Sequence, residues 1–201
     1  GNVWEWCLDA ATGVGAVVTD TYREGIRDPL AQGGPQRVFR GGSWDYSPAG
    51  CRSALRNAVE PSGADAHLGF RPVLAPRSGG GARLSPSVAS SAAESSPSAG
   101  SEGAATALAQ PGRGRSHVNS IGMKLLGVDA GTFQMGSSER ESGRDSDETL
   151  HGVTLSRPFW MAETEVTQGQ WTAVMGAASR GGFDWDNLGA EVAANTLDWN
   201  E

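Results

Sequence analysis

The stretch RVFRGGSW, residues 37–44, joins a short segment of apolar residues flanked by arginines to a Gly-Gly-Ser turn. A short run with a β-branched and an aromatic residue, bounded by a glycine turn, is typical of a strand. Gly41 and Gly42 then supply the backbone freedom that a tight turn requires. The stretch therefore predicts a strand that ends in a turn, with Ser43 at that turn.

Outside this turn the strand signals are short, and one helix signal is clear. Thr167 can accept hydrogen bonds from free backbone amides, and Gln170 can reach back in a capping box. Trp171, Val174 and Met175 then share one face, and Gly176 is a natural terminator. We expect an α+β fold with short strands and much irregular structure. The predicted strands cover 51–56, 68–74 with an edge or bulge at Pro72, 123–128 paired with 131–135, 153–155 and 159–161.

Composition divides the chain into three parts. Residues 1–76 and 117–201 contain all the tryptophans, whereas residues 77–116 have no aromatic residue and are mostly Ser, Ala, Gly and Pro. Such a stretch cannot bury enough apolar surface to offset its ordering entropy, so 77–116 is predicted to be a disordered linker. The two flanking parts have the composition of folded segments.

Charge and hydropathy restrict the partners. The formal net charge of −7 argues against nonspecific nucleic-acid binding. We therefore expect no nucleic-acid partner. No apolar run is long enough to cross a membrane, so we expect no membrane span either. Residues 139–148 are rich in acids, and together with His151 they could be drawn as metal ligands. Their spacing matches no standard metal loop, and we interpret the segment as a solvated surface loop.

Several single residues admit more than one interpretation. Cys7 and Cys51 could form one bridge, include a reactive thiol, or be small buried residues. Trp4 and Trp6 alternate, which favours packing in the core, as does the place of Trp171 on the predicted helix. For the arginines, ion pairs are favoured over a peptide groove; these are Arg52, Arg56 and Arg71.

Three sets of motifs resemble the formylglycine-generating-enzyme, or sulfatase-modifying-factor, family. The first is GNVWEW at 1–6; the second is RVFRGGSW at 37–44 with CRSALRN at 51–57 and LGFRPV at 68–73; the third is AGTFQMGS at 130–137 with HGVTLSRPFWMAETEVTQGQW at 151–171. In that family the first two sets belong to the C-terminal part of the domain and the third to the N-terminal part.

The resemblance implies a C-type-lectin-like fold present as two partial copies. Residues 1–76 would be the C-terminal part of one domain and residues 117–201 the N-terminal part of a second. The family's long middle segment has no counterpart here. We therefore expect a piece of a longer tandem-domain protein, in preference to a circular permutant that has also lost its middle. Packing of the two parts on each other as one unit of marginal stability is a further expectation.

The same resemblance implies a copper site at the Gly-Gly-Ser turn. Active members oxidise a cysteine of a client sulfatase to formylglycine, using oxygen and a Cu(I) ion held by two cysteines five residues apart. Cys51 matches the second cysteine and Ser43 matches an active-site serine, so both are candidate catalytic residues and Cys51 is the candidate copper ligand. Tyr46 stands where the first cysteine is expected, and a phenol is a poor substitute for a thiolate toward soft Cu(I).

A structural calcium ion is implied as well, through Gly1, Val3 and Glu5 of the GNVWEW motif. Three oxygen ligands fall short of the roughly six to eight that calcium takes, so the site would be partial. The alternative for Glu5 is an ion pair with an arginine. Two functions follow: oxidation of a sulfatase-like protein or peptide client, or a non-catalytic binding or scaffolding module that has lost the copper pair.

Overall fold

The computed structural model describes residues 2–12, 23–75, 110–176 and 189–197. These residues form mostly strands, with one α-helix, one 3₁₀ helix and much irregular structure. The elements are β1 (Trp4–Ala11), β2 (Ile26–Arg27), β3 (Gln36–Arg40), η1 (Pro48–Cys51), β4 (Arg56–Val59), β5 (Leu68–Gly69), β6 (Val73–Leu74), β7 (Ser116–Val118), β8 (Lys124–Val128), β9 (Gly131–Met135), β10 (His151–Leu155), β11 (Phe159–Ala162) and α1 (Gln168–Met175).

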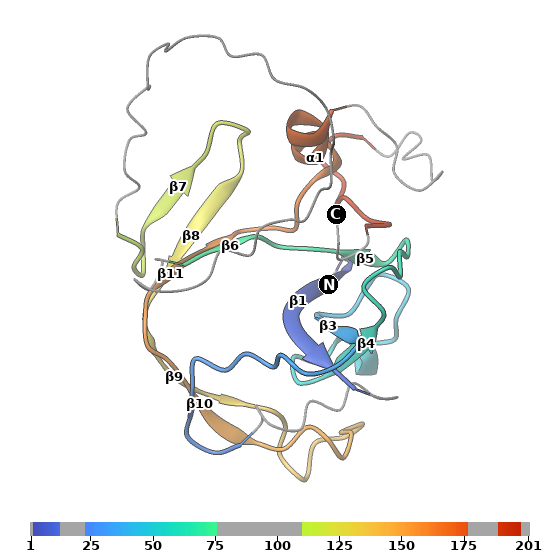
Figure 1. Cartoon of the computed structure of the whole chain (residues 1–201), viewed down its shortest axis with the longest axis vertical. Helices are drawn as coiled ribbons and strands as arrows, with labels where there is room; N and C mark the ends of the chain where they lie inside the picture. Colours follow the sequence, from blue (N-terminus) through green and yellow to red (C-terminus); the bar gives the residue numbers. More distant parts are fainter. Residues whose placement is uncertain (1, 13–22, 76–109, 177–188, 198–201) are drawn as a thin grey trace, which may run out of the picture.

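The described strands form three small sheets. Their orders are β4-β3-β1-β5, β2-β10-β9 and β6-β11-β8-β7. Figure 1 shows the first sheet on one side of the molecule, the β7–β8 hairpin on the other, and β9 with β10 at the bottom. Strand β1 pairs antiparallel with β3 and parallel with β5, so it lies at the centre of the first sheet.

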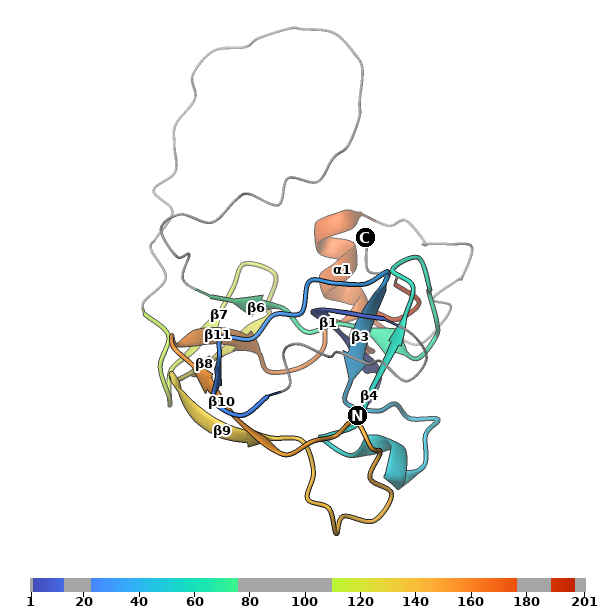
Figure 2. The same cartoon turned by 60° about the horizontal axis from the view of Figure 1, so that its bottom comes forward.

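Strands from the two ends of the chain pair with each other. β2 lies parallel to β10, and β6 lies antiparallel to β11. The indole Nε1 of Trp6 also donates to the carbonyl of Leu197, at 2.9 Å. The early segment, described over residues 2–12 and 23–75, therefore shares two sheets with the late segment, described over residues 110–176 and 189–197. Both views show the two segments side by side (Figures 1 and 2).

The larger buried cluster also joins the two segments. It contains Trp160 and Trp171 with smaller apolar residues, and Phe70 of the early segment packs against it. The rings of Phe70 and Trp171 meet edge to face with centroids 6.1 Å apart. Gly69 fits here because a Cβ at this position would lie 2.6 Å from the carbonyl oxygen of Ala194. Close approach of the two backbones therefore requires glycine.

Several sequence-based predictions are confirmed. β3 covers the predicted strand before the Gly-Gly-Ser turn, and short strands lie within or around most of the other predicted ranges. α1 begins after Thr167, whose side chain accepts from the backbone of Gln170 in a complete capping box, and Gly176 ends it. Trp4 and Trp171 are buried, at 1% and 6% exposure, as expected for core residues, while Trp6 is only partly buried.

Other predictions are wrong. Residues 51–56 do not form a strand, because η1 ends at Cys51 and a turn precedes β4. β8 and β9 do not pair with each other; β8 pairs with β7 and β11, and β9 pairs with β10. Of the three residues predicted to form the buried face of the helix, Trp171 is buried, but Val174 and Met175 are 64% and 40% exposed. Pairing with other strands decides the second case, and local sequence patterns carry no information about it.

Most of the predicted linker 77–116, namely residues 77–109, lies outside the described residues. The described part, from residue 110, contains a turn in which the amide of Arg115 donates to Gly112, and β7 begins at Ser116. Among the described residues, no helix is long and apolar enough to cross a membrane.

Candidate functional site

The Gly-Gly-Ser turn brings three residues of the predicted site together. The carbonyl oxygen of Ser43 accepts from the amide of Tyr46 at 3.1 Å and from the thiol of Cys51 at 3.8 Å. Gly42 has a φ of +73°, and a Cβ there would lie 2.6 Å from the Cys51 sulfur. Glycine is therefore required both by the left-handed backbone and by the close packing of Cys51 on the turn.

Ser43 is buried in an unusual way. The residue is only 1% exposed, and its Oγ has no hydrogen-bond partner among the described residues. A buried hydroxyl without a partner loses its hydration without compensation, so it is destabilising where it stands. Cys51 packs on the same turn, where its thiol contacts the carbonyl oxygen of Ser43.

Two aromatic residues of the same turn face solvent. Trp44 is 66% exposed and Tyr46 is 49% exposed. The ring of Tyr46 meets buried Trp4 edge to face at 5.1 Å, and Trp44 lies 5.2 Å from the His67 ring. His67 in turn hydrogen-bonds Asp65 through Nδ1. The same turn that contains Ser43 therefore exposes two aromatic rings to solvent, and each ring also contacts a neighbouring ring of the fold.

The two cysteines are separate thiols. Neither forms a disulfide bond, so the disulfide alternative is wrong. Cys7 lies on β1 against the smaller buried cluster, and burial raises the pKa of its thiol to about 11. The nearby Arg40 opposes this increase and is outweighed. Cys7 is therefore protonated at neutral pH, which makes it a poor metal ligand, since thiolates are the ligating form.

The donor set at the turn does not fit a two-thiolate copper site. Cys51 offers one sulfur, and Tyr46 offers a phenol, which is a hard oxygen donor. Among the described residues, no group of three or more His, Cys, Asp or Glu side chains is arranged to hold a metal ion.

The predicted calcium residues are only partly described. Gly1 lies outside the described residues, and Val3 is buried at 3% exposure. Both carboxylate oxygens of Glu5 accept from Arg71, at 2.7 and 3.1 Å. Arg71 also donates to the carbonyl of Glu163, which ties β1 to the segment after β11. A calcium ion at Glu5 would have to share its carboxylate with this guanidinium, and the calcium site stays a prediction.

Arg52, the residue after Cys51, forms a bidentate ion pair with Glu148. Both guanidinium–carboxylate distances are 2.7 Å, and Glu148 is 1% exposed. The Arg52 guanidinium is the main cause that holds the pKa of Glu148 below its ordinary value, with a hydrogen bond from Ser137 adding to it. This ion pair holds the segment that contains Cys51 against the loop that precedes β10.

Arg56 makes a second connection to the same loop. Its guanidinium contacts the carbonyl of Asp147 at 2.7 Å and the carboxylate at 3.0 Å. The three arginines 52, 56 and 71 are thus in ion pairs, as the sequence favoured. The interpretation of the acidic segment 139–148 as a solvated loop is wrong for Glu148, which is 1% exposed.

Sequence reasoning did not find the Arg52–Glu148 pair or the exposure of Trp44. The two partners of the pair are 96 residues apart, and one sequence gives no signal for such a distant contact. The position of Arg52 directly after Cys51 was the available signal that it belongs to the site.

Comparison with known proteins identifies the family. The Sulfatase-modifying factor enzyme 1-like domain matches residues 1–76 and 115–200. No curated protein and no solved structure matches the protein. The matched residues contain the Gly-Gly-Ser turn, Glu148 and the strands that join the two segments. The chain therefore belongs to the family of Sulfatase-modifying factor enzyme 1-like domains.

Proposed function

We propose that this domain binds a protein or peptide segment at residues 42–51, which run from the Gly-Gly-Ser turn through η1 and are called the turn 42–51 below. We propose further that it does not carry out copper-dependent oxidation. The observation that carries the proposal is the composition of this turn. It offers one thiol at Cys51 and exposes two aromatic rings, Trp44 and Tyr46. Aromatic residues are enriched in protein interfaces because they combine a large contact area with little loss of side-chain entropy.

The second candidate is the family's chemistry, oxidation of a client cysteine to formylglycine. The buried, unpartnered hydroxyl of Ser43 beside Cys51 favours it, because destabilising polar groups often mark functional sites. A sulfatase-like client, a copper ion at Cys51 and a partial calcium site at Gly1, Val3 and Glu5 belong to this candidate. The C-type-lectin-like arrangement and the origin of the two segments in neighbouring copies are likewise predictions from the family.

Copper binding separates the two candidates. We expect the wild-type protein to bind Cu(I) weakly and to leave the cysteine of a Cys-x-Pro-x-Arg peptide unoxidised. Tyr46→Cys should bind Cu(I) far more tightly, and adding Cys51→Ser should abolish the gain, because near-linear coordination needs both thiolates. Tight binding and peptide oxidation by the wild type would establish the second candidate instead.

Peptide binding tests the other half of the proposal. On an array of random peptides, we expect the wild-type protein to select a subset and Trp44→Ala to lose that selection. Leu8→Ala is the matched control, since Leu8 has the same 66% exposure but lies on β1, outside the turn. Equal losses in both variants would mean that the signal is nonspecific adhesion.

A further inference from the structure

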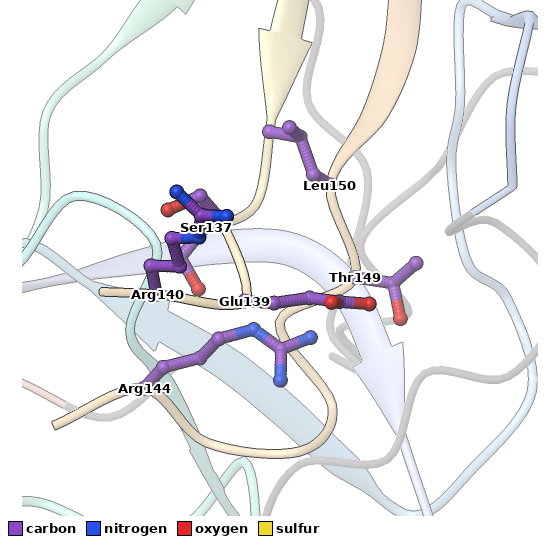
Figure 3. A pocket seen from close by; sticks show the side chains of 7 residues that line it. Ser137, Glu139, Arg140, Arg144, Thr149 and Leu150 are labelled. Carbon is purple, nitrogen blue, oxygen red and sulfur yellow. The ribbon is translucent and has the colours of Figure 1, made fainter. Parts of the chain in front are cut away.

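A pocket of about 400 Å³ lies in the loop before β10, on the loop that Arg52 attaches to the candidate site. Two arginines, three hydroxyl residues, one carboxylate and one leucine line it. Figure 3 shows Arg144 reaching across the loop toward the side of Glu139 and Thr149. The lining residues are Ser137, Ser138, Glu139, Arg140, Arg144, Thr149 and Leu150.

The two arginines of this pocket differ from the two nearby arginines, Arg52 and Arg56, in their ion pairing. Arg52 and Arg56 are engaged by Glu141, Asp147 and Glu148. Arg140 and Arg144 form no ion pair with any carboxylate of the described residues, including Glu139 of the same pocket.

Arg144 carries the strongest indication of an absent acceptor. Its Nε is buried and has no hydrogen-bond partner among the described residues. A buried guanidinium N–H without an acceptor is unfavourable, and a planar carboxylate is the group that matches the guanidinium fork best. The hydroxyls of Ser138 and Thr149 add further donors at the same pocket.

The acidic surroundings define what kind of binding is possible. Glu139 lines the pocket and Asp145 lies next to Arg144 in sequence, so no broad positive field attracts anions here. Affinity must come from direct hydrogen bonds to the two guanidinium groups, which carry both charge and shape specificity.

The pocket is close to the turn proposed to bind a peptide. A Cβ at Gly143 would lie 3.9 Å from the Cβ of Ala49 in η1, and Arg52 Nε donates to the carbonyl of Ala49. Figure 2 shows the loop and η1 side by side at the bottom of the molecule. A peptide segment on the turn can therefore extend to the pocket.

We propose that Arg140 and Arg144 bind a carboxylate of the peptide segment that docks at the turn 42–51, supplied by an acidic residue or by the carboxyl terminus of the peptide. This inference rests on the proposed peptide-binding function. It adds that the partner is acidic at the position that reaches the pocket.

Titration of the protein with three tripeptides tests the carboxylate directly, by the ¹⁵N resonances of the arginine Nε groups. Two probes are capped at both ends and have a central glutamate or a central glutamine, and the third is triglycine with a free C-terminal carboxylate. We expect the Arg144 Nε resonance to shift with the glutamate probe, with triglycine, or with both, and the responding probe identifies the source. The glutamine probe should leave it unchanged.

Substitutions complete the test. Arg144→Gln should weaken binding of the responding probe at least about tenfold, followed in this variant by the Nε resonance of Arg140, since the substitution removes a charged donor. Arg113→Gln, at an exposed arginine outside the pocket, should leave it unchanged. The inference is overturned if all three probes bind alike, if none shifts Arg144, or if Arg113→Gln has the same effect. Such a failure leaves the copper and Trp44 experiments unaffected, so it is distinguishable from failure of the proposed function.

Discussion

At the scale of single residues, two buried serines of similar exposure have opposite surroundings. Ser43 is 1% exposed with an unpartnered Oγ, whereas Ser137 is 2% exposed and donates to Glu148 at 2.7 Å. A hydroxyl that has lost its water without gaining a partner destabilises the fold, and one that donates to a buried carboxylate stabilises it. Deleting each hydroxyl while nearly conserving side-chain volume therefore separates a structural serine from a functional one.

We predict that Ser43→Ala raises the free energy of unfolding by about 1 kcal/mol. The reason is that the substitution removes a desolvated polar group and breaks no hydrogen bond of its side chain. Ser137→Ala, the control, should lower it by about 1–2 kcal/mol because Glu148 loses a donor. Chemical denaturation with a linear extrapolation measures both values. A loss of stability in Ser43→Ala would show that its hydroxyl is already satisfied.

At the scale of elements, the turn with Cys51 depends on an ion pair between residues far apart in sequence. We predict that Arg52→Ala lowers the free energy of unfolding by about 3 kcal/mol or more. The expected cost is large because Glu148 would remain buried without its cation. Lys124→Ala is the matched control, since Lys124 and Glu163 form an exposed pair at 2.8 Å with 47% and 43% side-chain exposure.

Thermal or urea unfolding of the two variants decides this prediction. The control should change stability by no more than about 0.5 kcal/mol, the usual worth of an exposed pair. Equal small effects in both variants would mean that Glu148 finds another partner or becomes hydrated when Arg52 is removed.

The same pair predicts how stability depends on pH. The pKa of Glu148 is lower in the folded protein than its ordinary value of 4.5. Its stabilising contribution is therefore complete above the unfolded pKa, and it is lost as the pH falls through the folded pKa. We expect Glu148→Gln to be less stable than wild type at neutral pH and the difference to shrink below about pH 4.5. A difference that stays constant from pH 7 to pH 3 contradicts this assignment.

These elements also show where sequence reasoning succeeds. The strand at residues 37–40, the capping box of Thr167 and Gln170, and the glycine turn are specified by neighbours in sequence, so a single sequence suffices to predict them. The placement of β8 and β9 in separate sheets depends on strands far away in sequence, whereas the 3₁₀ helix at residues 48–51 is a local feature that the strand prediction over 51–56 missed. The candidate site divides in the same way: Ser43, Tyr46 and Cys51 were predictable from their motif, whereas Glu148 and the Arg144 pocket were not.

At the scale of the whole molecule, the two family-matched segments depend on each other. β2 and β6 of the early segment have their strand partners, β10 and β11, in the late segment. Arg52, Arg56 and Arg71 connect to the late segment through the side chain or main chain of Glu148, Asp147 and Glu163. Since short strands with open edges are unstable alone, neither segment should hold its fold without the other.

We therefore predict that the molecule stays assembled after the connection between the segments is cut. After specific cleavage at a protease site introduced within residues 77–109, the two pieces should elute together from a size-exclusion column. Cleavage turns an intramolecular association into a bimolecular one, so the unfolding midpoint should then rise with protein concentration. The uncut protein, as the control, should show no such dependence. Separate elution of the pieces under native conditions would mean that the strand pairs and ion pairs between the segments are too weak to hold them without the covalent link.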